Sequence, residues 1–117
     1  TKDTLKLSIL KNMLLDENLL NYAKTKLIAA MFGQESEHFN AVINNPNDEN
    51  NELIRALKMD ESLEQYDFSD FKRAINRLLM LYFERKIAEI LASTDANKSQ
   101  KIKDLRKAIA IIKNEGI

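Results

Sequence analysis

Residues that break regular structure are rare in this chain of 117 residues, which contains two glycines and one proline. Apolar residues recur at intervals of three and four along most of its length, and this spacing places them on one side of a helix. The usual strand signals are missing. The sequence therefore predicts an all-helical fold.

The composition restricts the class of protein. Hydrophobic residues make up 44% and charged residues 31% of the chain, which is typical of one globular domain. Because 18 basic residues face 18 acidic ones, the whole chain has no charge signature for DNA, RNA or an anionic membrane. No cysteine is present, so disulfides and thiolate metal sites are excluded.

From the sequence we also form expectations about where the protein is located and whether the chain is part of a longer protein. No apolar run approaches the ~20 residues of a membrane-spanning helix, and no signal peptide opens the chain, so we expect a cytoplasmic protein. The first residue is Thr1 and not methionine, which suggests a fragment of a longer protein.

Capping residues divide the first half of the chain into short helices. We expect a first helix over residues 3–15 and a second that Asp16 caps and Gly33 ends. A third covers "SEHFNAVINN" and stops before Pro46, because proline disfavours helical geometry in the preceding residue. Either Asn50 or Asn51 opens the fourth helix.

Two longer helices follow. Asp67 is the expected N-cap of a helix over about 68–92, with Tyr66 packed on Phe71 as a hydrophobic staple. The last helix is expected over 98–114, and we expect Asn97 and Gln100 to cap its start.

The apolar stripe of the long helix changes sides along its length. At ~100° per residue, one set of apolar residues shares an arc, and a second set lies about a third of a turn away. The first set consists of Phe68, Phe71, Ile75, Leu78, Leu79 and Tyr82, and the second of Phe83, Ile87, Ile90 and Leu91. We therefore expect a helical bundle over residues 1–82 and a C-terminal helical hairpin over 83–117, joined through the one long helix. The stripe that meets the second set is Ile102, Leu105, Ile109 and Ile112.

The hairpin has features of a docking surface. Two antiparallel helices bury only the seam between them, and Ile111 lies well off that seam. Residues 84–117 contain eight basic and five acidic residues, an excess of three positive charges. This excess could steer the hairpin to an acidic protein surface, or it could be an ordinary solvated helix face.

Signs of catalysis are weak. Glu35 and His38 have the spacing of a carboxylate–histidine metal motif, but such sites need a second pair and His38 is the sole histidine. We expect no catalytic, cofactor-binding or metal-binding residues. Nucleic-acid contact is also not expected, because the aromatic residues fall on apolar stripes and not among clustered lysines. A single-strand binding module would have to use Lys98, Lys101, Lys103, Arg106 and Lys107.

In the order of its features, the chain resembles the C-terminal, helicase-interacting domain of bacterial DNA primase of the DnaG type. The resemblance covers nearly the whole chain and is carried by "LSILKNMLLDENLL", "FSDFKRAINRLLMLYFERKIAEIL" and "KIKDLRKAIAIIKNEGI". It implies that the hairpin docks on the N-terminal collar of the hexameric replicative DNA helicase and that the bundle modulates the helicase. It further implies that the zinc-binding and RNA-polymerising domains of primase lie upstream, so that this fragment is non-catalytic and recruits primase to the replication fork.

The resemblance also suggests a set of contact residues, matched only by their position on the outward side and end of the last helix. They are Lys103, Arg106, Lys107, Ile111, Asn114 and Ile117. A competing assignment is the N-terminal domain of the replicative helicase, which has a similar bundle and hairpin. The terminal "KNEGI" weighs against it, because a helicase fragment would lead into a linker.

Overall fold

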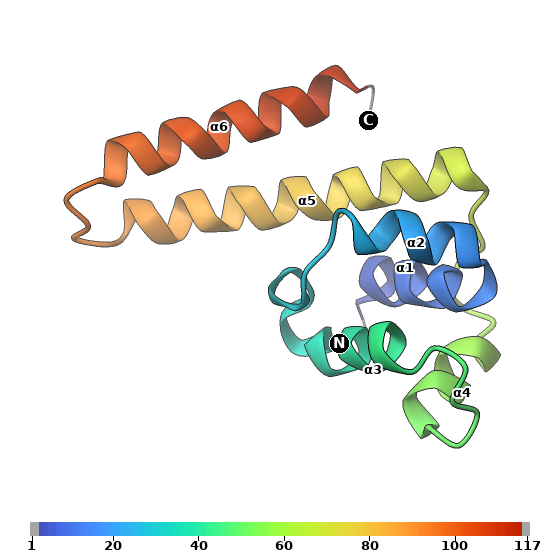
Figure 1. Ribbon diagram of the computed structural model, residues 1–117. Coiled ribbons are helices and arrows are strands. Elements are labelled where there is room, and N and C mark those ends of the chain that lie inside the picture. The colour runs from blue at the N-terminus through green and yellow to red at the C-terminus, as the bar shows by residue number, and fades with distance from the viewer. Residues whose placement is uncertain (1–2, 116–117) are drawn as a thin grey trace. The chain divides into compact units, whose positions relative to one another are not determined.

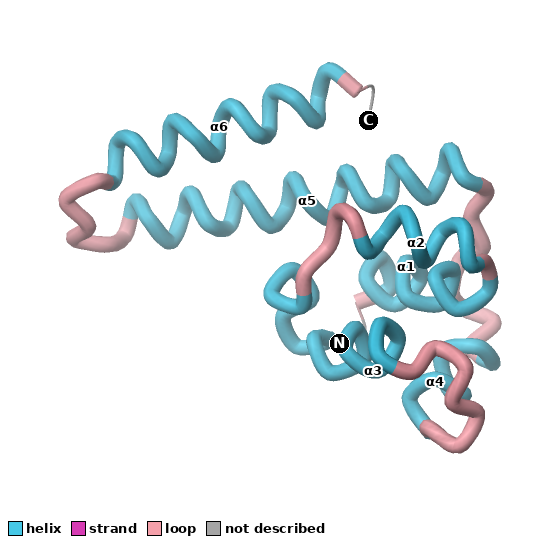
Figure 2. Tube along the Cα trace, viewed as in Figure 1, coloured by secondary structure: helices cyan, strands magenta, loops and turns pink. Residues whose placement is uncertain are grey.

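The computed structural model describes residues 3–115, and all regular structure in that range is helical (Figures 1 and 2). This confirms the all-helical prediction. The elements are α1 (Thr4–Leu15), α2 (Glu17–Lys24), the 3-10 helix η1 (Ala29–Glu35), α3 (Ser36–Asn44), α4 (Glu52–Met59), α5 (Phe68–Leu91) and α6 (Lys98–Asn114). Within residues 3–115, no helix has both the length and the apolar character needed to cross a membrane.

The chain forms two compact units, Thr1–Ile75 and Asn76–Ile117, and α5 contributes to both. The first unit contains α1 to α4 and the start of α5, and the second contains the rest of α5 and α6. The sequence placed the division at residues 82 and 83, so the two divisions differ inside α5. Asn76 lies in the second unit, and its side-chain amide donates a hydrogen bond to Glu115 Oε2 over 3.3 Å, just after the end of α6.

Helix α1 is the centre of the first unit. It contacts α2, α3, α4 and η1, and the side chains of Ile9, Leu10 and Met13 are fully enclosed. Phe32 of η1 stacks on Phe39 of α3 with ring centroids 4.7 Å apart. Helix α1 is therefore surrounded by the other helices of this unit.

The predicted N-caps of three helices are confirmed. Asp16 accepts a hydrogen bond from the backbone N–H of Asn18 at 2.8 Å, and Asn51 accepts one from that of Leu53 at 2.9 Å. At the start of α5, Asp67 accepts from the N–H of Asp70 at 2.7 Å. Each cap satisfies a donor that has no partner inside the helix. The expected staple is also present, with the Tyr66 and Phe71 rings 6.5 Å apart.

The chain between α2 and α3 differs from the prediction of one helix that continues to Gly33. Helix α2 ends at Lys24, because the hydroxyl of Thr25 donates to the carbonyl of Tyr22 at 2.6 Å and closes the last turn. Ile28 is then extended, with φ −130° and ψ 159°, and is 53% exposed. Gly33 has φ 51°, a left-handed value that favours glycine, and it interrupts the helical geometry as expected.

The predicted cap of α6 is wrong. The Asn97 side chain makes no capping hydrogen bond, and Gln100 donates to Asp104 Oδ1 at 2.9 Å. Asp95 instead shapes the turn before α6, since its carboxylate accepts from the backbone N–H of Asn97 at 2.7 Å and pairs with Lys101.

A row of polar residues on α1 holds the segment that leads into α5. Lys11 Nζ donates to the Asp60 carbonyl at 2.7 Å, and the Asn12 amide donates to the Glu64 carbonyl at 2.8 Å. Asn12 Oδ1 also accepts from the Tyr66 backbone N–H at 2.8 Å. These bonds fix the extended chain before α5, and so they position the first turn of that helix within the first unit.

Candidate partner-binding surface

The second unit is a hairpin in which α6 runs back along α5 (Figure 1). Of the predicted seam residues on α6, Ile102 and Ile112 are buried, whereas Leu105 and Ile109 are half-buried. On α5, Phe83, Ile87 and Ile90 are half-buried as well. The hairpin therefore has a narrow apolar seam and leaves most of α6 exposed.

The turn between the two helices is held by polar side chains. The hydroxyl of Ser93 donates to the Ile90 carbonyl at 2.7 Å, and Lys98 Nζ donates to the Leu91 carbonyl at 3.2 Å. Lys101 forms a close ion pair with Asp95. The hydrogen bond from Lys101, followed by that from the Asn97 backbone N–H, lowers the pKa of the Asp95 carboxyl below its ordinary value.

These contacts weaken the hypothesis that the hairpin is a module for binding single-stranded nucleic acid. Of the five cations that such a module would use, Lys98 and Lys101 are engaged within the turn. Both serve to close the hairpin. The remaining three cations lie together at a different place.

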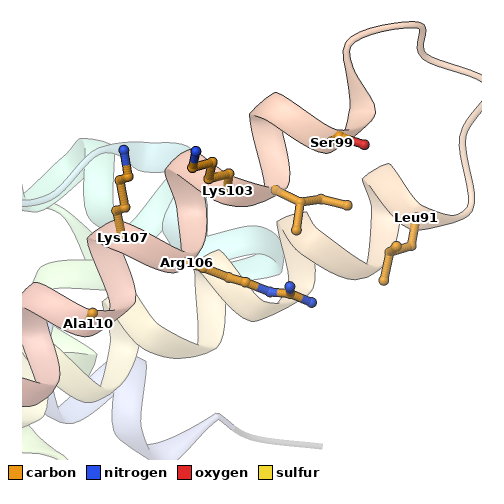
Figure 3. Close-up of a pocket in the computed structure, with 7 residues that line it drawn as sticks. Leu91, Ser99, Lys103, Arg106, Lys107 and Ala110 are labelled. Atoms are coloured by element: carbon orange, nitrogen blue, oxygen red, sulfur yellow. The ribbon is translucent and has the colours of Figure 1, made fainter.

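An open groove of about 590 Å³ lies on the hairpin, lined by Leu91 of α5 and by six residues of α6 (Figure 3). Its apolar lining comes from Leu91, Ile102 and Ala110, and Leu91 is 55% exposed. Lys103, Arg106 and Lys107 supply positive charge, and Ser99 completes the lining. In Figure 3, Lys103 and Lys107 point to the same side, while Arg106 extends in another direction toward the Leu91 side of the groove.

The three cations of the groove are not neutralised within the described part of the chain. None of them forms an ion pair or hydrogen bond with another residue of the range 3–115. Long cationic side chains with no internal partner are available to an anionic group outside the domain. Combined with the exposed apolar lining, they make this groove a candidate binding surface of the hairpin.

The structure divides the predicted contact residues. Lys103, Arg106 and Lys107 all line the groove. Ile111 is 63% exposed and Asn114 is exposed, but neither lines the groove. Ile117 lies outside the described residues.

Sequence reasoning missed four residues of the groove, namely Leu91, Ser99, Ile102 and Ala110. Leu91 was assigned to the seam with α6, but the helix ends at this residue and its side chain is more than half exposed. The signal that could have identified it is its place at the edge of the second apolar arc, next to the turn.

The Glu35 and His38 pair does not form a wider site. His38 Nδ1 lies 3.0 Å from Glu35 Oε2, yet the ring nitrogen makes no properly directed hydrogen bond. The contact is thus an ion pair only when the imidazole is protonated. Within residues 3–115, no group of three or more histidine, cysteine, aspartate or glutamate side chains could hold a metal ion.

Two helical units, one of them a hairpin that carries an open groove, define a class of all-helical domain suited to protein contact. The chain belongs to the family of the DnaG-primase C-terminal, helicase-binding domain, whose model matches residues 3–116. The resemblance seen in the sequence is thereby confirmed, and the competing assignment to the helicase itself is not supported.

A solved structure is similar over the full chain. The crystal structure of the Helicobacter pylori DnaG primase C-terminal domain matches with a TM-score of 0.82 and 25% sequence identity. The match covers 100% of this chain and 96% of that chain. No curated protein sequence matches significantly.

Proposed function

We propose that this domain binds the N-terminal collar of the hexameric replicative DNA helicase through its hairpin, and that it thereby recruits primase to the replication fork. The family assignment supports a helicase as the partner. The observation that carries the choice of the hairpin is its groove, which combines exposed apolar surface with three unpaired cations. In this proposal the domain has no catalytic role, and the primer-synthesising parts of primase lie elsewhere in the parent chain.

The groove suits a helical segment of the partner that carries both apolar and acidic side chains. Apolar side chains of the partner would cover Leu91 and Ala110, and its carboxylates would meet Lys103 and Lys107. This arrangement is the usual one for a helix bound in a groove, where an apolar stripe provides anchors and flanking charges fix the orientation.

The residues off the groove extend the proposed contact. Ile111 and Asn114 lie on exposed positions of the same helix, and Ile117 is part of the proposal from its position in the sequence. Because a hairpin of this size offers a small interface, we expect modest affinity. Primase could then exchange between successive priming events.

The test is calorimetry of the domain with a purified helicase N-terminal domain. Arg106→Glu places an acidic group in the groove, and we expect it to weaken binding about 10-fold or more, as removal of a central contact does. Ile111→Asp tests the second part of the surface, with an expected loss of about 5-fold. Arg55→Glu, on the exposed surface of α4, makes the same charge change away from the hairpin and serves as the control.

Two results would contradict the proposal. Unchanged affinity of the Arg106→Glu domain would remove the groove from the interface. Helicase binding that persists after deletion of residues 84–117, with the bundle still folded by circular dichroism, would remove the hairpin altogether.

A further inference from the structure

A second surface lies on the first unit, where the end of α2 meets the start of α5. Tyr22 and Phe68 pack edge to face with ring centroids 5.3 Å apart. Lys26 Nζ lies 5.9 Å from the centroid of the Tyr22 ring, and Lys72 Nζ lies 5.7 Å from that of Phe68. The two packed rings thus lie between two cations, and we refer to the four side chains as the aromatic–lysine ridge.

The ridge is both accessible and rigidly supported. Phe68 is 49% exposed although it is a large apolar residue, and Tyr22 is half-buried. Tyr22 rests against Phe71 at 6.5 Å between ring centroids, and Phe71 is completely buried. A ring held in this way loses little conformational freedom when a ligand stacks on it.

The acidic residues near the ridge are already engaged. Asp67 caps α5 through the N–H of Asp70, and the carboxylate of Asp70 pairs with Arg73 at 3.0 Å. Lys26 and Lys72 form no ion pair with another residue of the range 3–115, and each ammonium group lies over one of the two rings. Both ammonium groups can therefore turn from the rings to an external anion.

We propose that the aromatic–lysine ridge is a contact site for single-stranded nucleic acid, separate from the hairpin. A base would stack on the half-exposed Phe68 ring, and Lys26 and Lys72 would each bind a phosphate. Stacking on aromatic side chains with cations along the backbone is the general mode of binding to single strands, and it needs no base sequence. Each lysine stands four residues after its ring in the sequence, but the sequence alone does not predict that the two pairs meet, because Tyr22 and Phe68 are far apart along the chain.

The charge of the first unit sets the expected strength of the contact. Residues 1–75 contain nine basic and thirteen acidic residues, so the unit as a whole is negative. Attraction therefore comes from the ridge alone, and we expect a dissociation constant of about 100 µM or weaker at physiological salt. Contacts of this strength matter when the strand is already held near the protein.

The experiment titrates the whole domain with fluorescein-labelled oligothymidylate of twelve nucleotides and follows backbone amide shifts by NMR. We expect shifts around Tyr22, Lys26, Phe68 and Lys72. Phe68→Leu keeps an apolar side chain but removes the flat ring, and it should weaken binding about 5-fold or more. Lys26→Gln and Lys72→Gln should each reduce the slope of log affinity against log salt by about 0.7. Arg55→Gln, in the same unit but away from the ridge, should change neither quantity.

Three outcomes would overturn the proposal. Shifts confined to α6 would place any nucleic-acid contact on the hairpin. Equal affinity of Phe68→Leu and wild type, with both folded, would exclude stacking at this ring. Tighter binding of a glutamate-rich peptide containing phenylalanine would assign the ridge to a protein partner.

Discussion

At the scale of single residues, Asn12 stabilises the fold although its side chain is polar. Its buried amide group makes three hydrogen bonds, to the carbonyls of Ser8 and Glu64 and from the N–H of Tyr66. Asn12→Ala removes a donor and an acceptor from the segment before α5, and we expect a loss of about 2–4 kcal/mol in the free energy of unfolding. Chemical denaturation measures this value.

The matched control is Asn21→Ala on the exposed side of α2. Both substitutions replace asparagine by a better helix former, so any difference between them reports the buried hydrogen bonds. We expect the control to stay within about 0.5 kcal/mol of wild type. Equal effects of the two substitutions would show that the polar row on α1 does not hold the α5 segment.

Most residues whose role depends on near neighbours were predictable, with the exception of the Asn97 and Gln100 cap, and residues whose role depends on distant ones were not. Asp16, Asn51 and Asp67 cap helices through bonds two or three residues away. The sequence predicts Asp16 and Asp67, and it offers Asn51 as one of two candidates. By contrast, Asn12 bonds to residues more than fifty positions away, and the exposure of Phe68 depends on packing that no local pattern specifies.

At the scale of elements, the turn between α5 and α6 should respond to pH through Asp95. Its pKa is lowered because Lys101 and the Asn97 N–H bind the ionised carboxylate. A lowered pKa in the folded state means that the stabilisation is present above the unfolded-state value of about 3.9 and is lost as the pH falls through the folded value. We therefore expect the turn to loosen as the pH falls below the folded-state pKa of Asp95. NMR shifts of residues 93–98 measure this change.

Asp95→Asn is the variant for this test, since it keeps the size of the side chain and removes its charge. The wild-type turn in acid should then resemble the variant at neutral pH. A variant that shows the same acid-induced shifts in this turn as the wild type would assign the effect to another group.

The long helix and its neighbours show how far elements can be read from sequence. The change of apolar side along α5 predicts two sets of neighbours, and the structure has two compact units that share this helix. The short elements between α2 and α3 were not predictable to the same degree. Leu27, Met31 and Phe32 are all buried, but they reach the core through an extended residue and a 3-10 turn, and their spacing alone imitates a continuous helix.

At the scale of the whole molecule, the two units bury very different amounts of apolar surface. The first unit encloses most of the fully buried side chains, among them Ile9 and Ile54, whereas α6 buries only Ile102 and Ile112 in the described range. Charge is divided as well, because residues 76–117 contain nine basic and five acidic residues. The sequence predicts a bundle and a more exposed, basic hairpin. It does not predict the groove, because the groove depends on where α5 ends and on the exposure of Leu91.

This difference in burial predicts separate opening of the two units. We expect amide hydrogens of α6 to exchange at least about 10-fold faster than those of α1 in native-state hydrogen exchange, because a unit with fewer buried contacts opens at lower free energy. Ile102→Ala should lower the opening free energy of α6 by about 2–4 kcal/mol, as expected for loss of a buried isoleucine. Amides of α1 should be unaffected. Ile9→Ala should give the opposite pattern, with faster exchange in α1 through α4 and a smaller effect in α6. If each substitution accelerated exchange equally in both units, the domain would unfold as one cooperative body, and the hairpin could not rearrange independently when it meets a partner.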